Sequence, residues 1–166
     1  DRRHSQKQRR PLARGTLSLT WAIRGMMILW ALGGLLVTWL DPSLLKGVAL
    51  YWGMACLYAF YVRKLAVVDV LWLASLFCLR ILLGIWAIQV PFSMWLLNFS
   101  FFLFLSLSLI KRYTDVLQEG ATALAGRGYQ PGDQPVLGQM GLGSGIVSVL
   151  VLVLYTDSAH VVSLYQ

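Results

Sequence analysis

Apolar stretches decide the fold of this chain, and one of them reads LAVVDVLWLASLFCLRILLGIWAI over residues 65–88. Five such stretches are separated by polar breaks, at residues 17–40, 44–62, 65–88, 92–110 and 142–156. Each approaches the roughly 20 residues that a helix needs to cross about 30 Å of hydrocarbon. The sequence therefore predicts an all-α fold, a polytopic transmembrane helix bundle with five spans.

Composition argues against a soluble protein and against a nucleic-acid-binding protein. The hydrophobic fraction is 58% and the mean hydropathy is +0.67, which leaves too little polar surface for a soluble all-helical protein. The net charge of +7 could indicate nucleic acid, but the basic residues lie next to the spans, without zinc-finger spacing or an RNA-binding signature. The expected partners are the membrane lipid bilayer, through its anionic headgroups, and a phosphorylated donor, with no nucleic acid.

The basic residues also predict an orientation in the membrane. Six of them precede the first span, others follow the second and fourth spans, and the opposite loops carry only Lys46. By the positive-inside rule, residues 1–16 and 111–141 are cytoplasmic loops, and the turns at residues 41–43 and 89–91 lie on the other side. The chemistry of the protein is therefore expected on the cytoplasmic side.

Residues 111–141 form the only long polar connection in the sequence, and such connections are usually functional or disordered. If the fourth helix continues into this segment, Arg112, Asp115 and Glu119 share one helix face, and Lys111 is placed to pair with Asp115. Carboxylates together with Lys and Arg are what Mg²⁺ and a diphosphate require. A solvated helix end with local ion pairs is the alternative interpretation.

Two charged residues lie within the third span, Asp69 and Arg80. They are eleven residues apart, about three helical turns, so they return to nearly the same face. A charge inside the membrane costs at least about 2.5 kcal/mol by insertion scales, so both side chains are expected to point into the bundle or a wet cavity. Asp69 lies nearer the cytoplasmic end and is the candidate for a catalytic role. For Arg80, a buried pair that bridges helices is the alternative.

The beginning of the chain resembles a signature of the UbiA superfamily of intramembrane prenyltransferases, which reads Asn-Asp-x-x-Asp-x-x-x-Asp at the end of the second helix. Asp1 resembles the last Asp of that signature. One bacterial branch continues as Asp-Arg-x-His-Pro-x-Lys-x-x-Arg-Pro-x-Ala-x-Gly, and the chain is similar to it, with Ser5 in place of the first Pro. The matching residues are Asp1, Arg2, His4, Lys7, Arg10, Pro11, Ala13 and Gly15.

Residues near the end of the fourth span resemble the second signature of the superfamily, Asp-x-x-x-Asp after the sixth helix. Here the signature reads Asp115-x-x-x-Glu119, with Glu in place of the commoner Asp. The triplet Lys111-Arg112-Tyr113 directly before it is similar to the branch that contains decaprenyl-phosphate phosphoribosyltransferase. Other positions that resemble the family are Tyr58, Arg63, Leu79, Arg80, Gly84, Pro91, Ser93 and Trp95.

The resemblance covers the whole chain and implies a domain organisation. Residues 1–166 would be part of one UbiA-type transmembrane domain, from the end of helix 2 to helix 7 of a nine-helix fold. The chain by itself is then expected to be inactive. The intact protein is expected in the bacterial inner (cytoplasmic) membrane, with its active side facing the cytoplasm.

The resemblance also implies a set of site residues and a cofactor. Mg²⁺ would be held by Asp1, Asp115 and Glu119, and would stabilise a departing diphosphate. Asp69 joins these three as a candidate catalytic residue. The implied substrate-binding residues are Lys7, Arg10, Tyr58, Arg63, Arg80, Lys111, Arg112 and Tyr113.

The activity implied by the resemblance is that of a Mg²⁺-dependent transferase, which displaces diphosphate from a prenyl diphosphate with a lipid or aromatic acceptor. One alternative is a polyprenyl-phosphate 5-phosphoribosyltransferase that uses phosphoribosyl diphosphate. Another is a non-enzymatic membrane transporter or scaffold. Transporters often contain internal repeats around a site at the middle of the membrane. The sequence shows no such repeat and gathers its polar groups at one surface, which favours the enzyme.

Overall fold

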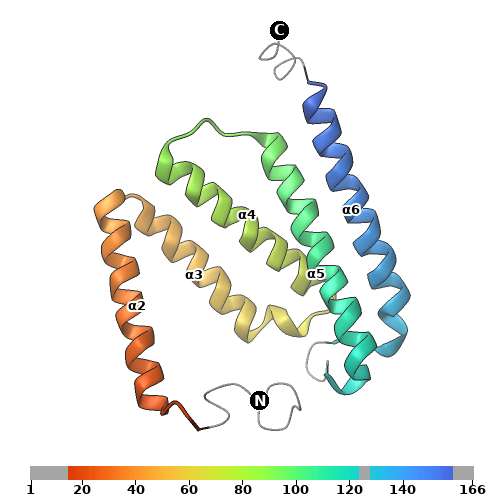
Figure 1. Ribbon diagram of the computed structural model, residues 1–166, viewed down its shortest axis with the longest axis horizontal. Coiled ribbons are helices and arrows are strands. Elements are labelled where there is room, and N and C mark those ends of the chain that lie inside the picture. Colours follow the sequence, from red (N-terminus) through yellow and green to blue (C-terminus); the bar gives the residue numbers. More distant parts are fainter. Residues whose placement is uncertain (1–14, 124–127, 159–166) are drawn as a thin grey trace. The chain divides into compact units, whose positions relative to one another are not determined.

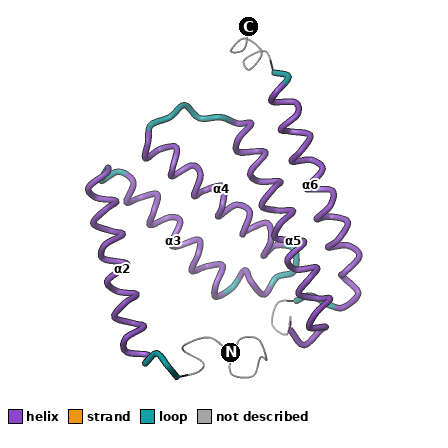
Figure 2. The backbone as a smooth tube through the Cα atoms, in the orientation of Figure 1, coloured by secondary structure: helices purple, strands orange, loops and turns teal. Residues whose placement is uncertain are grey.

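The computed structural model describes residues 15–123 and 128–158, with the backbone alone described for residues 118–123 and 131. Its helices follow in the order α2 (Leu19–Leu40), α3 (Leu44–Phe60), η2 (Val62–Lys64), α4 (Val68–Ile88), α5 (Met94–Ala123), η3 (Pro131–Asp133) and α6 (Gln134–Thr156) (Figure 1). The described ranges contain no strand (Figure 2). The predicted all-α class is confirmed.

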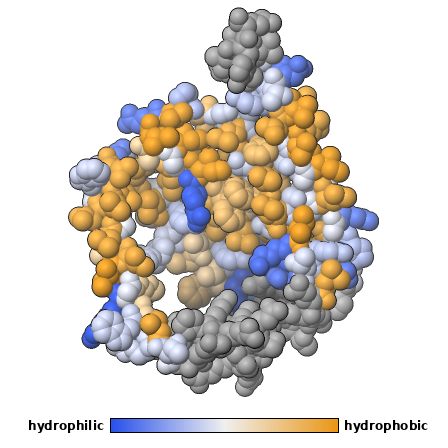
Figure 3. Space-filling model, in the orientation of Figure 1, coloured by the Kyte–Doolittle hydropathy of each residue, from blue (hydrophilic) through white to orange (hydrophobic). Residues whose placement is uncertain are grey.

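Five of the described segments are long and apolar enough to cross a membrane, judged by length and composition. These candidate spans are Leu19–Leu40, Leu44–Lys64, Val68–Ile88, Met94–Leu117 and Gln134–Thr156. Hydrophobic residues cover much of the face seen in Figure 3. A helix satisfies its backbone N–H and C=O groups internally, which is the condition for crossing hydrocarbon. The structure is consistent with an integral membrane protein of five spans.

The structure corrects the extent of the polar connection expected over residues 111–141. α5 continues to Ala123 and α6 begins at Gln134, so most of that segment is helical. Polarity rises after residue 110, but Lys, Arg, Gln and Glu are good helix formers, so a polar sequence does not end a helix. Pro135 stands in the first turn of α6, where the missing N–H of a proline costs nothing. The cytoplasmic location of this segment stays a prediction.

The chain divides into two compact units after Leu45. In the first unit, α2 begins after Ser18, whose Oγ accepts a 3.4 Å hydrogen bond from the N–H of Trp21. Beyond α2, the carboxylate of Asp41 accepts hydrogen bonds from the N–H and the hydroxyl of Ser43, at 2.8 and 2.7 Å. These hydrogen bonds hold the pKa of Asp41 below its ordinary value, because they stabilise the charged form.

The core of the second unit lies where α4, α5 and α6 meet. Its buried side chains are Val70 and Ala74 of α4, Leu105, Leu109 and Val116 of α5, Leu137 of α6, and Tyr129 from the segment before α6. Tyr129 therefore belongs to the core although it lies outside the candidate spans. Its burial ties the segment before α6 to the beginning of α4.

Small residues let α5 and α6 approach each other closely, as in many membrane helix pairs. A Cβ on Gly141 would lie 3.2 Å from Cγ1 of Ile110, and one on Gly145 would lie 3.1 Å from Oγ of Ser106. The hydroxyl of Ser106 donates a 2.7 Å hydrogen bond to the carbonyl of Gly141. α5 is thereby fixed against α6 along the half that carries the candidate site.

Candidate functional site

The site forms around the loop between α3 and α4. Val67 in this loop has φ 65°, a positive value that β-branched residues rarely adopt. Its N–H donates a 3.0 Å hydrogen bond to the hydroxyl of Tyr129, which lies 62 residues further along the chain. α4 then begins at Val68 and carries Asp69 in its first turn, where a carboxylate is stabilised by the helix N-terminus.

The segment before α6 approaches this loop so closely that one position requires glycine. Gly128 has φ +73°, and a Cβ there would lie 2.7 Å from the carbonyl oxygen of Lys64. Glycine is the residue that accepts both the positive φ and the close backbone contact. The contact brings Tyr129 to the loop and to Asp69.

A buried ion pair joins α4 to α5 at this point. Nε of Arg112 donates a 2.8 Å hydrogen bond to Oδ2 of Asp69, and the hydroxyl of Tyr129 donates to Oδ1 of the same carboxylate. Nη1 and Nη2 of Arg112 donate to Asp115 at 3.2 Å and to the hydroxyl of Tyr58 at 3.3 Å. The network therefore connects α3, α4, α5 and the segment before α6.

Burial makes this network sensitive to the loss of any member. Asp69 is 0% exposed, Arg112 3% and Tyr129 6%. An unpaired charge at such depth is strongly unfavourable, so each partner depends on the other. Among the described residues, no buried side-chain nitrogen or oxygen lacks a hydrogen-bond partner. A fully satisfied network of this kind holds its side chains in one arrangement.

Burial raises the pKa of the Tyr129 phenol above its ordinary value, and the hydrogen bond to Asp69 raises it further. Both effects disfavour the phenolate, because the charged form would be poorly solvated and would face a carboxylate. Tyr129 therefore stays protonated across the physiological range. It acts as a hydrogen-bond donor that holds the Asp69 carboxylate in place.

These contacts change the roles expected for the residues at the end of the fourth span. The resemblance implied Arg112 as a substrate-binding residue, but its guanidinium is buried and engaged by Asp69, Asp115 and Tyr58. Asp115 pairs with Arg112, and Lys111 forms no ion pair with a described carboxylate. The expected pair of Lys111 and Asp115 is therefore absent. Lys111 is exposed, so its ammonium is the accessible cation of this pair of residues.

Lys111 and Arg112 stand at one end of a cavity of about 320 Å³ between α4 and α5. The remaining lining is Leu73 and Phe77 of α4 with Phe104, Leu107 and Ser108 of α5. Phe77 and Phe104 stack, with ring centroids 4.4 Å apart. The cavity thus combines an apolar floor with positive charge at one end. We call it the α4–α5 cavity.

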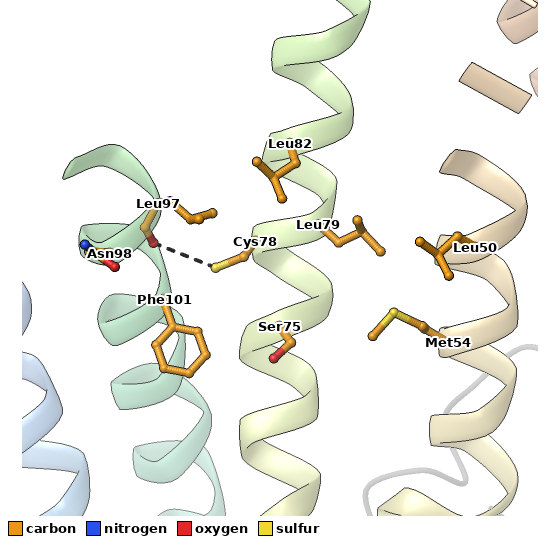
Figure 4. A pocket seen from close by; sticks show the side chains of 9 residues that line it. All are labelled: Leu50, Met54, Ser75, Cys78, Leu79, Leu82, Leu97, Asn98 and Phe101. Carbon is orange, nitrogen blue, oxygen red and sulfur yellow. Dashed lines mark hydrogen bonds between the residues drawn. The ribbon is translucent and has the colours of Figure 1, made fainter. Parts of the chain in front are cut away.

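A second cavity, of about 410 Å³, lies between α3, α4 and α5 (Figure 4). In this view Phe101 points from α5 toward α4, and Leu79 points from α4 toward α3. The thiol of Cys78 contacts the carbonyl of Leu97 at 3.9 Å, and the hydroxyl of Ser75 donates to Leu71. No charged side chain lines this cavity, so it suits an apolar group better than a phosphate.

Other predicted site residues lie away from the buried network. Asp69 is buried in the bundle, as expected, but Arg80 is exposed. The two charged residues were expected on nearly one face of the helix, and the structure gives them different environments. Tyr113 is half-buried and packs against α6, where it lies 3.3 Å from the position of a Cβ on Gly138. Arg63 is exposed on η2.

Most of the predicted magnesium site falls outside the described side chains. Asp1, Lys7 and Arg10 lie outside the described residues, and Glu119 is described only as part of the α5 backbone. The described residues contain no cluster of three or more His, Cys, Asp and Glu side chains. Asp115 keeps 33% of its side chain exposed, and Mg²⁺ commonly binds one or two carboxylates together with phosphate and water. The carboxylate present is thus compatible with such an ion.

Sequence reasoning missed Tyr129 and the pairing of Asp69 with Arg112. The pair had a signal: Asp69 begins the third span, Arg112 ends the fourth, and opposite charges at one membrane depth are expected to pair. For Tyr129 the only local signal was the preceding Gly128, which permits the close approach of the two segments. That approach depends on the packing of α6 and could not be read from spacing.

Comparison with known proteins gives partial similarities. The chain is 33% identical to the nodulation protein NoeC of Azorhizobium caulinodans over 164 residues, which is 97% of this chain and 53% of that protein. An uncharacterised protein, y4nM of Sinorhizobium fredii, is 31% identical over 158 residues, 93% of this chain and 31% of the relative. No family profile and no solved structure matches the chain.

One similar protein carries the name of an enzyme. The chain is 29% identical to the decaprenyl-phosphate phosphoribosyltransferase of Mycobacterium tuberculosis over 116 residues, 70% of this chain and 38% of that protein. The chain thus spans about half or less of the length of the curated relatives it matches. The similarity links a chain with five candidate spans to a transferase whose name includes a polyprenyl lipid.

Proposed function

We propose that this chain belongs to a membrane transferase of the UbiA type that joins a phosphoribosyl group to a polyprenyl phosphate and releases diphosphate. The observation that carries the proposal is the α4–α5 cavity, which has an apolar floor and the accessible cation Lys111 at one end. The similarity to decaprenyl-phosphate phosphoribosyltransferase supports the phosphoribosyl donor over the prenyl diphosphate donor that the resemblance implied first.

The shape and chemistry of the cavity suit a lipid that carries a single anionic head. Leu73, Phe77, Phe104 and Leu107 offer apolar surface to an isoprenoid chain. Burial of that chain is favourable by about 25 cal/mol for each Å² of apolar surface removed from water. Lys111 at the cavity end supplies a compact positive charge for the phosphate. A prenyl diphosphate would use the same apolar floor and cation, so the preference for the phosphoribosyl donor rests on the similarity to decaprenyl-phosphate phosphoribosyltransferase.

The buried network has a positioning role in this proposal. Arg112 also lines the cavity end, and Asp69 and Tyr58 hold its guanidinium in one orientation. Because the Arg112 guanidinium is already fixed, it loses little conformational entropy when a phosphate binds beside it, and this favours binding. Asp69 is therefore proposed as a positioning residue rather than a catalytic one, because both of its oxygens already accept hydrogen bonds.

Charge balance at the cavity end supports a role for Mg²⁺. The positive charges of Lys111 and Arg112 are matched in number by the negative charges of Asp69 and Asp115. A diphosphate donor therefore needs further positive charge, for which we propose Mg²⁺ on Asp115, Asp1 and Glu119, and the basic residues of the first loop, Lys7 and Arg10. Bound there, Mg²⁺ would neutralise charge that develops on the departing diphosphate.

The proposed reaction is a displacement at the anomeric carbon of phosphoribosyl diphosphate. An oxygen of the polyprenyl phosphate forms the new C–O bond, and the bond between the anomeric carbon and the diphosphate oxygen breaks. The electron pair of that bond leaves with the diphosphate. Lys111 holds the attacking phosphate, and Lys7 and Arg10 are proposed to bind the donor, because charge-assisted hydrogen bonds to phosphate are among the strong ones.

The test uses the intact protein, purified and supplied with polyprenyl phosphate, labelled phosphoribosyl diphosphate and Mg²⁺. Lys111→Ala should raise the KM for polyprenyl phosphate about tenfold or more, because one charge-assisted hydrogen bond contributes about 1.5 to 3 kcal/mol. The matched control, Lys46→Ala, removes an exposed lysine from the beginning of α3 and should leave both KM values unchanged. A wild type that consumes prenyl diphosphate with an aromatic acceptor and ignores the sugar donor refutes the proposal.

A further inference from the structure

Arg80 is an exposed cation near the middle of a membrane span. It lies twelve residues after Val68 and eight before Ile88, which places its Cα about 18 Å and about 12 Å from the two ends of α4. α4 carries only one other charged residue, Asp69, and that residue is buried. Arg80 takes no part in the network around Arg112.

The guanidinium of Arg80 is held toward the middle of the span. It lies 5.4 Å from the ring centroid of Tyr51 and 5.5 Å from that of Phe77, and Nη2 donates a hydrogen bond to the Tyr51 hydroxyl. Phe77 lies one turn toward the beginning of α4, so the side chain folds away from the nearer end of the helix. An arginine that served as an interfacial anchor would extend to that nearer end instead.

The aromatic contacts leave most of the donor capacity of Arg80 without an anionic partner. Arginine has five N–H donors, and among the described residues the Tyr51 hydroxyl is the partner of Nη2. No described carboxylate forms a salt bridge with Arg80. Charged side chains inside membranes almost always pair with an opposite charge or face a wet cavity. An anion at the same depth would meet this condition.

None of the carboxylates that the structure describes lies at that depth. The acidic residues of the sequence are Asp1, Asp41, Asp69, Asp115, Glu119, Asp133 and Asp157. Asp69 and Asp115 lie within candidate spans, but at their ends, and both contact Arg112. The described part of a second copy would bring no mid-span carboxylate either. A phospholipid phosphate would have to leave the membrane surface to reach Arg80, because headgroups lie outside the hydrocarbon region.

The surface beside Arg80 also has room for a helix. Gly84 lies one turn further along α4 and is exposed, and apart from the adjoining residues of α4 no atom lies within 4 Å of the place where a Cβ would stand. Small residues at such positions let the backbone of another helix approach closely. Arg80, Gly84, Phe77 of α4 and Tyr51 of α3 together form what we call the Arg80 face.

We propose that the Arg80 face docks a transmembrane helix that lies outside these 166 residues and carries an Asp or Glu near its middle. The carboxylate of that helix pairs with the Arg80 guanidinium, whose orientation is set by Tyr51 and Phe77. The relatives are long enough to contain such a helix, since this chain covers 31% to 53% of their length. The inference does not depend on the proposed transferase activity.

The test places the photo-crosslinking residue benzoylphenylalanine at Gly84 in the intact protein, in its native membrane. Irradiation should join Gly84 to a peptide outside residues 1–166 that has one acidic residue within an apolar stretch. Arg80→Gln should lower the yield at least fivefold, and Arg80→Lys should retain it because the cation is kept. The same probe at Trp86, on the opposite face of α4, is the matched control and should not give this product.

A charge exchange provides the second measurement, which does not depend on a bulky probe at Gly84. Arg80→Glu should lower the thermal stability of the intact protein, and replacing the identified carboxylate by Lys in the same protein should restore it. Cross-linking to lipid alone, to a second copy of this sequence, to a helix without an acidic residue, or to no protein at all overturns the proposal. A yield that Arg80→Gln leaves unchanged overturns it as well.

Discussion

Removal of the charge on Asp69 should destabilise the protein more than any change of an exposed carboxylate. In Asp69→Asn, the side chain next to Arg112 keeps its size and shape, but Nε of Arg112 loses the negatively charged oxygen that lies 2.8 Å away. Arg112 is 3% exposed, so water cannot replace the lost partner. The remaining charged partner is Asp115, at 3.2 Å from Nη1 and with 33% of its side chain exposed.

Removal of one member of a buried pair typically costs about 3 to 5 kcal/mol, because the other charge is left uncompensated. We expect about 3 kcal/mol for Asp69→Asn, at the lower end of that range, since Asp115 still compensates part of the charge on Arg112. Arg112→Met should cost a similar amount, because it leaves the Asp69 carboxylate buried with Tyr129 as its neutral donor. The double variant should cost no more than either single variant, because it leaves no buried charge.

The measurement is reversible unfolding of the intact protein in mixed micelles, followed by tryptophan fluorescence as denaturing detergent is added. Asp157→Asn is the matched control, because Asp157 is an exposed carboxylate beyond α6. Exposed substitutions of this kind usually change the free energy of unfolding by less than about 0.5 kcal/mol. A loss for Asp69→Asn no larger than that of the control would refute the reasoning. Additive losses in the double variant would show that the two charges do not depend on each other.

Three further outcomes are expected. Tyr129→Phe should cost about 1 to 3 kcal/mol in the free energy of unfolding, because buried Asp69 loses a donor. The folded state raises the pKa of this phenol, so the stabilisation that Tyr129 gives is complete below the ordinary tyrosine pKa of about 10 and decreases as the pH rises above that value. The free energy of unfolding should therefore fall between pH 8 and pH 11 in the wild type, and this loss should be absent from Tyr129→Phe. Gly128→Ala should destabilise by at least about 1 kcal/mol in the same unfolding assay, because of its positive φ and close backbone contact, whereas Gly132→Ala meets open space and should be near neutral. A cysteine at Gly132 should react with an impermeant label only from the cytoplasmic side and one at Ser43 only from outside, and labelling of both from one side would contradict the predicted topology.

The helices themselves could be predicted from the sequence, because a membrane span is a local property. A stretch such as residues 65–88 is apolar over the length that crosses a bilayer, and a single helix satisfies its own backbone groups there. The ends of the helices were less predictable. α5 continues through polar residues to Ala123, because hydropathy marks where lipid contact stops and not where hydrogen bonding between successive turns stops.

The candidate site was predicted as a set of residue types, but not as a set of contacts. The side chain of Lys111 is exposed and can reach a phosphate, whereas the neighbouring Arg112 is buried and bound by Asp69 and Tyr58. Successive helix positions point about 100° apart, so which of two adjacent cations faces the core depends on where neighbouring helices pack. The sequence alone could not assign that difference.

The sequence by itself determined the number of spans and the charges available at their ends, because both follow from the solvation of single residues and short stretches. The tertiary structure decided which charged side chains are paired inside the protein and which remain accessible to a ligand. Asp69 and Tyr129 are 60 residues apart, and they meet because Gly128 lets the segment before α6 contact the loop that precedes α4. Such a contact forms only when the packing of α4, α5 and α6 brings distant segments together.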